Sequence, residues 1–170
     1  GKFMTGVYVD NKMEKKWLIY APEGYLESEG NFENNTKNGP WKYYNKSRQL
    51  QKELYFEKDM VNGNCKIYEK GRLSGEGTMS GTFKSYKRNG IWKEIHPTGK
   101  TASEGPYRMD KKLGKFKEYY PTGALKAEGE YMNNKKNGKW TFYKKDGKTI
   151  DPELSGSYMM DKLNKKLDMK

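Results

Sequence analysis

Apolar and polar residues alternate along short stretches of the chain, and polar turns rich in glycine separate these stretches. In the stretch 125–131, Leu125, Ala127, Gly129 and Tyr131 occupy every second position, and charged residues fill the positions between them. A period of two residues is typical of a strand with one packed face and one solvated face. Because the same alternation recurs at 26–32 and 101–107, the pattern predicts a protein made of short β-strands.

The strands belong to a repeat with a period of 24 residues, twice lengthened to 27. One column of mostly aromatic residues marks the first strand of each unit: Trp17, Trp41, Cys65, Trp92, Phe116, Trp140 and Leu167. Eleven residues before each of these lies a second column: Gly6, Gly30, Leu54, Gly81, Gly105, Gly129 and Gly156. Nine residues before each lies a third: Tyr8, Phe32, Phe56, Phe83, Tyr107, Tyr131 and Tyr158. Three columns in register predict a tandem repeat array.

Each unit contains a hairpin and a second turn that leads into the next unit. The segments 21–24, 96–99 and 120–123 have proline second and glycine fourth, which is the preference of a type I turn. The extra three residues fall within 73–81 and 149–156, where we expect bulges or widened turns. The sequence thus predicts an all-β fold, an elongated single-layer antiparallel β-meander of about six hairpin repeats of 24–27 residues.

The repeat pattern covers residues 1–170, which we interpret as a single array with partial units at 1–12 and 159–170. Phe3 to Tyr8 resembles the second strand of a unit whose first strand is missing, and the chain stops just past Leu167. We therefore expect this array to be part of a longer one, or to be capped in an unusual way. Open terminal edges would also permit end-to-end self-association.

The glycine and aromatic columns have a physical explanation, because a glycine in a strand lets a neighbouring ring lie flat on the backbone. The structural repeat positions are Trp17, Trp41, Trp92, Phe116, Trp140, Gly30, Gly105 and Gly129. Three residues after the tryptophan column comes a column of tyrosines, whose members either complete the core or line the second face of the sheet as a stripe open to a partner. This candidate interaction surface consists of Tyr44, Tyr68, Tyr119 and Tyr143.

The repeated unit reads Asn-Gly-x-Trp-x-x-Tyr-x-x-x-Gly-x-Leu-x-x-Glu-Gly-x-Tyr, and 38–41, 89–92, 123–131 and 137–140 carry it best. It resembles the variant MORN repeat of bacterial proteins, some of which form an antitoxin-like family. The resemblance implies an open β-meander and an interaction role. Cys65, Ile95 and Leu54 depart from the pattern, and we expect the units that contain them to pack less regularly.

A formal net charge of +12 gives the protein a positive field that can attract nucleic acid, anionic lipid or an acidic protein. Lysine doublets are assigned to the turns, where they form either a solvated rim or an electrostatic strip for lipid or nucleic acid: Lys15-Lys16, Lys111-Lys112, Lys135-Lys136 and Lys144-Lys145. Glutamates also recur, and we expect them to interleave with lysines in a cross-strand charge ladder rather than to form catalytic pairs: Glu29, Glu53, Glu104, Glu128, Lys42, Lys93 and Lys117.

Residues suited to catalysis or metal binding are scarce. His96, the single histidine, lies in a predicted turn, and Cys65 stands in the tryptophan column as a buried thiol that has no partner for an internal disulfide. We find no zinc-ligand spacing, no phosphate-binding glycine motif and no apolar stretch long enough to span a membrane. We predict no catalytic residues, cofactor or metal, and the compartment stays open between the bacterial cytoplasm and export by an upstream signal.

The function that these features favour is a non-catalytic repeat scaffold that binds another protein, with an antitoxin-like neutraliser as a specific form. The alternative is a basic surface that binds anionic lipid or nucleic acid through the lysine-rich turns, which strong salt dependence would reveal. An enzyme is the least favoured class, because it would need a pocket with convergent polar groups.

Overall fold

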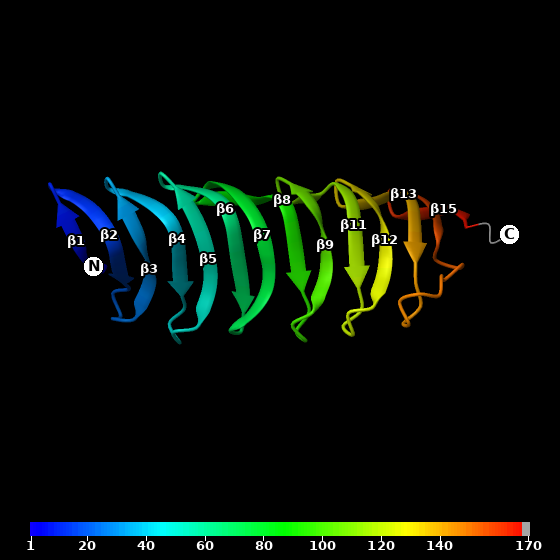
Figure 1. The fold of residues 1–170 in the computed structure, drawn as a ribbon, viewed down its shortest axis with the longest axis horizontal. Coiled ribbons are helices and arrows are strands. Elements are labelled where there is room, and N and C mark those ends of the chain that lie inside the picture. The colour runs from blue at the N-terminus through cyan, green and yellow to red at the C-terminus, as the bar shows by residue number, and fades with distance from the viewer. Residues whose placement is uncertain (168–170) are drawn as a thin grey trace. The chain divides into compact units, whose positions relative to one another are not determined.

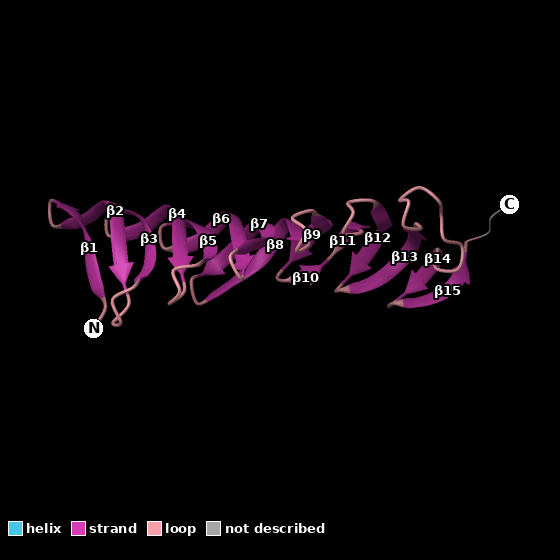
Figure 2. Ribbon diagram, turned by 90° about the horizontal axis from the view of Figure 1, so that it is seen from below, coloured by secondary structure: helices cyan, strands magenta, loops and turns pink. Residues whose placement is uncertain are grey.

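A computed structural model describes residues 1–167, and all of the regular elements in that range are β-strands. They form a single open antiparallel sheet in meander order, with β10 pairing beside the main path on β9 (Figures 1 and 2). The predicted all-β meander is confirmed. The strands are β1 Phe3–Val9, β2 Lys12–Tyr20, β3 Leu26–Glu33, β4 Thr36–Tyr44, β5 Leu50–Glu57, β6 Met60–Glu69, β7 Arg72–Thr82, β8 Ser85–Ile95, β9 Thr101–Arg108, β10 Lys111–Lys112, β11 Gly114–Tyr119, β12 Leu125–Met132, β13 Lys135–Phe142, β14 Gly156–Met159 and β15 Lys162–Lys166.

The chain divides into two compact units, a first unit of Gly1–Lys87 and a second unit that begins at Arg88. Each is a run of consecutive hairpins and is described by itself below. Of the partial unit expected at 159–170, the last three residues lie outside the described part of the chain.

Two kinds of turn join the strands. In the predicted type I turns the fourth residue donates its N–H to the carbonyl of the first, as Gly24 does to Ala21 at 2.9 Å and Gly123 to Tyr120 at 2.7 Å. The other kind is a two-residue turn in which both residues have positive φ, for example 50° at Asn34 and 67° at Asn35. Asparagine and aspartate tolerate this left-handed backbone, and it matches the twist of a tight hairpin.

In five of the two-residue turns the second residue, an asparagine or aspartate, also ties its hairpin to the preceding one. The N–H of Asp59 donates to the carbonyl of Lys37 at 3.0 Å, and the Asp59 carboxylate accepts the N–H of Lys37 at 2.7 Å. The same pair of hydrogen bonds recurs in both units, between Met13 and Asn35, Arg88 and Asp110, Lys112 and Asn134, and Lys136 and Asp161. These turns therefore bind neighbouring repeats as well as reversing the chain.

The tryptophan and glycine columns pack as the repeat pattern suggests. A β-carbon added at Gly30 would lie 2.3 Å from the ring of Trp41, and one at Gly129 would lie 2.3 Å from the ring of Trp140. Both rings are fully buried. Edge-on contacts from the third column complete their surroundings, with Phe32 5.1 Å from Trp41 between ring centroids. A single layer can bury such rings because the glycine lets each ring sit directly on the backbone.

A column of basic residues covers the same rings from the other side. Lys37 holds its ammonium 4.0 Å above the centre of the Trp41 ring, and Lys136 lies 5.1 Å from that of Trp140. Long basic side chains of this kind bury their methylene stems on apolar surface and contribute a cation–π attraction.

The assignment of the lysine doublets to turns was therefore mostly wrong. Lys15-Lys16, Lys111-Lys112 and Lys135-Lys136 lie in strands, and only Lys144-Lys145 lies in a turn. The physical reason is that the two-residue turns end earlier than expected, so that Lys112 and Lys136 fall on strand positions that face the aromatic rings.

One repeat of the first unit departs from both the glycine column and the aromatic column. Leu54 stands where the other repeats have glycine, Cys65 stands where they have an aromatic ring, and each is only 1% exposed. This repeat thus has the larger side chain in the glycine column and the smaller one in the aromatic column, and we expect the leucine to offset the volume that the cysteine lacks. The extra residues at 73–81 extend β7 instead of widening a turn, because β7 pairs with β6 without interruption from Thr82 to Gly75. A register shift of the kind expected for a bulge lies in the same stretch, between Gly75 and Leu73. The second insertion does form a loop, at 151–155.

Candidate interaction surface

The sheet has two chemically different faces, here named the aromatic face, which carries the tryptophan column, and the ladder face. On the ladder face, strand register places glutamate opposite lysine: Glu29 with Lys42 and Lys42 with Glu53 in the first unit, Lys93 with Glu104, Glu104 with Lys117 and Lys117 with Glu128 in the second. The glutamates and lysines singled out in the sequence thus alternate across the strands. Cross-strand neighbours of opposite charge attract, each pair weakly at an exposed site.

The four candidate tyrosines lie on the ladder face, half-buried. Each is separated by three positions from the aromatic column, so strict alternation turns it away from the tryptophans. Their hydroxyls donate to the ladder glutamates at 2.6–2.7 Å, in the pairs Tyr44 with Glu29, Tyr68 with Glu53, Tyr119 with Glu104 and Tyr143 with Glu128. They do not complete the aromatic core. They form a hydrogen-bonded border of the ladder.

These contacts hold the phenols in their neutral form. Burial, followed by the Glu104 carboxylate, raises the pKa of Tyr119 to about 12, and the corresponding causes raise the pKa of Tyr68 to about 12. At Tyr143 the hydrogen bond to Glu128 is the largest cause of the raised pKa. A phenol that donates to a carboxylate resists ionisation because it would place two negative charges together.

The ladder face of the second unit is hollowed. An open hollow of about 740 Å³ extends over β8, β9, β11, β12 and β13, with Glu104, Lys117 and Glu128 in its lining. The backbone of Gly105 and Gly129 forms part of its floor. Ile91 lines it and is 58% exposed. An exposed apolar side chain among alternating charges makes this hollow a candidate contact surface.

The residues weighed for chemistry have structural partners. Nε2 of His96 lies 2.9 Å from the carbonyl oxygen of Tyr119. A carbonyl oxygen only accepts, so this hydrogen bond requires a proton on Nε2. Tyr120 has the same repeat position one unit later, and its hydroxyl donates to the carbonyl of Tyr143. Cys65 is buried, and burial raises the pKa of its thiol. Within residues 1–167 no three His, Cys, Asp or Glu side chains gather as a metal site. That range also contains no helix long and apolar enough to cross a membrane.

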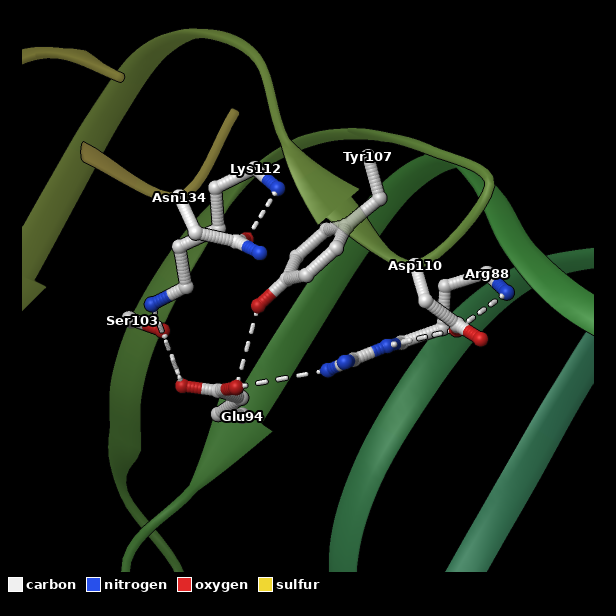
Figure 3. Close-up of polar contacts among 7 residues, drawn as sticks. All are labelled: Arg88, Glu94, Ser103, Tyr107, Asp110, Lys112 and Asn134. Carbon is white, nitrogen blue, oxygen red and sulfur yellow. Dashed lines mark hydrogen bonds and ion pairs between the residues drawn. The ribbon is translucent and has the colours of Figure 1, made fainter. Parts of the chain in front are cut away.

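A polar cluster on the aromatic face of the second unit was not foreseen. The Glu94 carboxylate accepts from the hydroxyls of Ser103 at 2.7 Å and Tyr107 at 3.0 Å, and it pairs with Arg88 at 3.4 Å and Lys112 at 3.6 Å (Figure 3). Burial favours the neutral carboxyl, but these four groups outweigh it and hold the pKa of Glu94 below its usual range. The carboxylate is therefore held in place by two hydroxyl groups and two cations.

The sequence contains a signal for this cluster. Arg88 and Lys112 belong to a basic column four residues before the tryptophan column, and its steps along the chain equal those of the tryptophans. Glu94 stands two residues after Trp92, on the same face, in a column whose other members are apolar or aromatic except for Glu118, and a charged side chain at such a position requires a partner. Following these two columns through the repeat would have paired Arg88 with Glu94.

The segments 88–109 and 112–133 each match the family model of the MORN repeat variant. These matches support a protein of the MORN-repeat kind. The two MORN segments are successive repeats of the second unit, and they contain Trp92, Glu94 and Phe116. MORN repeats are generally non-catalytic modules that bind proteins or membranes.

Comparisons with whole proteins add little to the MORN assignment. No curated protein matches the chain. Among solved structures, a mutant of S. aureus TarM in complex with Fondaparinux, alpha-GlcNAc-glycerol and UDP is similar over 58% of this chain and 19% of that chain, with 11% identity and a TM-score of 0.37. This chain thus spans about a fifth of that protein, and the likeness carries no functional argument.

Proposed function

We propose that this chain is a non-catalytic repeat scaffold that binds a partner protein through the ladder face of its second unit. The hollow around Ile91 is the observation that carries the proposal. It combines an exposed aliphatic side chain with Pro106 beside it and a surrounding set of lysines and glutamates. Protein interfaces likewise combine exposed apolar side chains with paired polar groups.

The tyrosine border extends the proposed surface. Tyr119 and Tyr143 belong to the same face and the same unit as the hollow, and their hydroxyls are fixed by Glu104 and Glu128. A ring that is already held in one orientation loses little conformational entropy on binding, which favours affinity. We include these two tyrosines, with Tyr44 and Tyr68 as their equivalents in the first unit, in the binding surface.

A toxin protein is the specific partner class that the antitoxin-like bacterial variants suggest. The support for it is the resemblance of the repeat sequence. A neutraliser of this kind would bind its partner stoichiometrically and without turnover, which agrees with a face that offers contact area and paired charges.

The test is an affinity capture from lysate of the source organism at low and at high salt, with the wild type and two variants. Ile91→Lys places a charge in the hollow, whereas Met159→Lys makes the same charge change at an exposed apolar residue of β14 that does not line the hollow. We expect a stoichiometric protein that resists high salt, is lost with Ile91→Lys and is retained with Met159→Lys. Equal capture by both variants would place the contact elsewhere and refute the proposed surface.

The same capture experiment would refute the scaffold if no protein were recovered in stoichiometric amount. Nucleic acid or lipid that binds at low salt and is released at high salt, with no stoichiometric protein, would support the basic-surface alternative. The net charge of +12 makes this comparison necessary, because a positive field attracts anionic polymers without any specific site.

A further inference from the structure

The first unit contains two lysines whose ammonium groups are packed among aromatic rings. Lys37 Nζ lies 4.0 Å from the ring centre of Trp41 and between 5.1 and 5.3 Å from those of Tyr43, Phe56 and Phe83. Lys52 Nζ lies 5.2 Å from the ring centre of Tyr43 and 5.3 Å from that of Phe83. The two cations therefore share the faces of Tyr43 and Phe83.

Each ammonium has one neutral oxygen partner in the described chain. Lys37 donates to the hydroxyl of Tyr43 at 3.0 Å, and Lys52 donates to the hydroxyl of Tyr86 at 3.0 Å. An ammonium has three N–H groups, so both lysines retain donors for a further acceptor. The ammonium groups of Lys37 and Lys52 lie beside the same rings and have no carboxylate of residues 1–167 bonded to them, so they repel each other. An anion bound by both would relieve that repulsion.

The acidic groups that act on Lys37 through space are engaged with other partners. Glu27 is paired with Lys2 at 2.5 Å, and the carboxylate of Asp59 accepts the backbone N–H of Lys37 at 2.7 Å. Neither carboxylate bonds to the ammonium of Lys37 or Lys52. The charge of the pair is thus left for an external group.

The second unit shows what fills the same place when the protein supplies the anion itself. Lys37 and Arg88 both stand four residues before the tryptophan column, Tyr43 and Glu94 two residues after it, and Lys52 and Ser103 eleven residues after it. In the second unit these positions form an ion pair of Arg88 with Glu94 and a hydrogen bond from Ser103. In the first unit tyrosine replaces the glutamate and a second cation replaces the serine. Relative to the second unit, the first unit has the same cation, lacks the carboxylate and carries a second positive charge.

We propose that Lys37 and Lys52 bind an acidic side chain of a partner polypeptide, whose carboxylate supplies the negative charge that Glu94 supplies in the second unit. The rings of Tyr43 and Phe83 are stacked 5.3 Å apart, and both ammonium groups lie 5.1–5.3 Å from the two ring centres, which brings the two cations to one ring pair. Phe83 is 40% exposed, so the cluster is open to solvent at this ring. The proposal shares with the proposed function only the idea that the partner is a protein, because it concerns the aromatic face of the first unit.

The test is an NMR titration of the lysine side chains with a hexaglutamate peptide at fixed ionic strength, with hexaserine and inorganic phosphate as comparison probes. We expect saturable shifts at Lys37 and Lys52, while Lys46, an exposed turn lysine, stays unchanged. Uniform shifts at all lysines would mean general charge attraction and would overturn the site. Tighter binding of phosphate than of hexaglutamate at Lys37 and Lys52 would overturn the choice of a carboxylate.

Two variants copy the second unit into the first. Tyr43→Glu supplies an internal carboxylate, and Lys52→Ser removes the second cation; both should weaken hexaglutamate binding by about tenfold or more, the scale of a hydrogen bond to a charged group. Lys46→Ser makes the same charge change as Lys52→Ser and should change the affinity less than about twofold. Unaltered binding by Tyr43→Glu would refute the proposal, and the wild-type titration alone decides if a variant fails to fold. If hexaglutamate does not bind but a protein is still captured in an Ile91-dependent way, this proposal is overturned and the proposed function stands.

Discussion

Trp41 lies so close to the backbone of Gly30 that a β-carbon at residue 30 would be 2.3 Å from the ring carbons. The ring is fully buried and is held from its other side by Lys37. Neither partner can move away without exposing apolar surface. The pair therefore determines how tightly two neighbouring strands of the first unit can pack.

Gly30→Ala should destabilise the first unit by about 2 kcal/mol, because inserting a methyl group into a packed site forces side chains and backbone to shift. Chemical denaturation followed by tryptophan fluorescence measures the change. Gly24→Asn is the matched control, since Gly24 has open space around it and a φ of 86° that asparagine tolerates. A similar loss in both variants would show that the contact with Trp41 is not the cause.

Leu54 and Cys65 should behave as a coupled pair. Leu54→Gly leaves a cavity and Cys65→Trp overfills the site, and each change should cost about 2 kcal/mol or more. The double variant restores the glycine and tryptophan of the other repeats, so it should be more stable than the sum of the single losses predicts. A double-mutant cycle measures this coupling, and simple additivity would contradict the proposed exchange of volume.

The repeat pattern was sufficient to predict the meander, the type I turns and the packing of Gly30 on Trp41, because these follow from local spacing. It did not reveal the cation column, because Lys112 and Lys136 lie two residues after a turn, in lysine doublets that are typical of solvated turns. The Glu94 cluster joins β8, β9 and β10, so its geometry depends on strand register and not on spacing within one strand. The function of Asp59 and its equivalents was hidden for the same reason, since each one bonds to the preceding hairpin.

Tyr119 should make stability depend on alkaline pH. Its pKa is raised to about 12, so between about pH 10 and pH 12 the folded chain binds a proton that the unfolded chain has lost. Its contribution to stability is complete below pH 10 and is lost as the pH rises through 12. The free energy of unfolding of wild type should fall more steeply in that window than that of Tyr119→Phe, which cannot ionise. Identical slopes would contradict the raised pKa of Tyr119, to which burial and the hydrogen bond to Glu104 both contribute.

Lys37 should produce the opposite slope at lower pH. Burial, together with the charges of Lys2 and Lys52, lowers the pKa of Lys37 to about 8, although Asp59 and Glu27 act against that shift. Between about pH 8 and pH 10 the unfolded chain therefore binds more protons than the folded chain, and stability rises with pH. The hydroxyl of Tyr43 accepts from Lys37 and stays neutral in this window, because burial raises its pKa further.

Lys37→Met removes the titrating group and keeps an unbranched side chain over Trp41, so the rise in stability between pH 8 and pH 10 should disappear. Urea denaturation at closely spaced pH values measures it, and Lys46→Met at an exposed turn should retain the wild-type slope. A rise that persists in Lys37→Met would assign the titration to another group. A bound carboxylate would raise the pKa of Lys37, so saturating hexaglutamate should move the rise to higher pH in wild type and leave Tyr43→Glu unchanged.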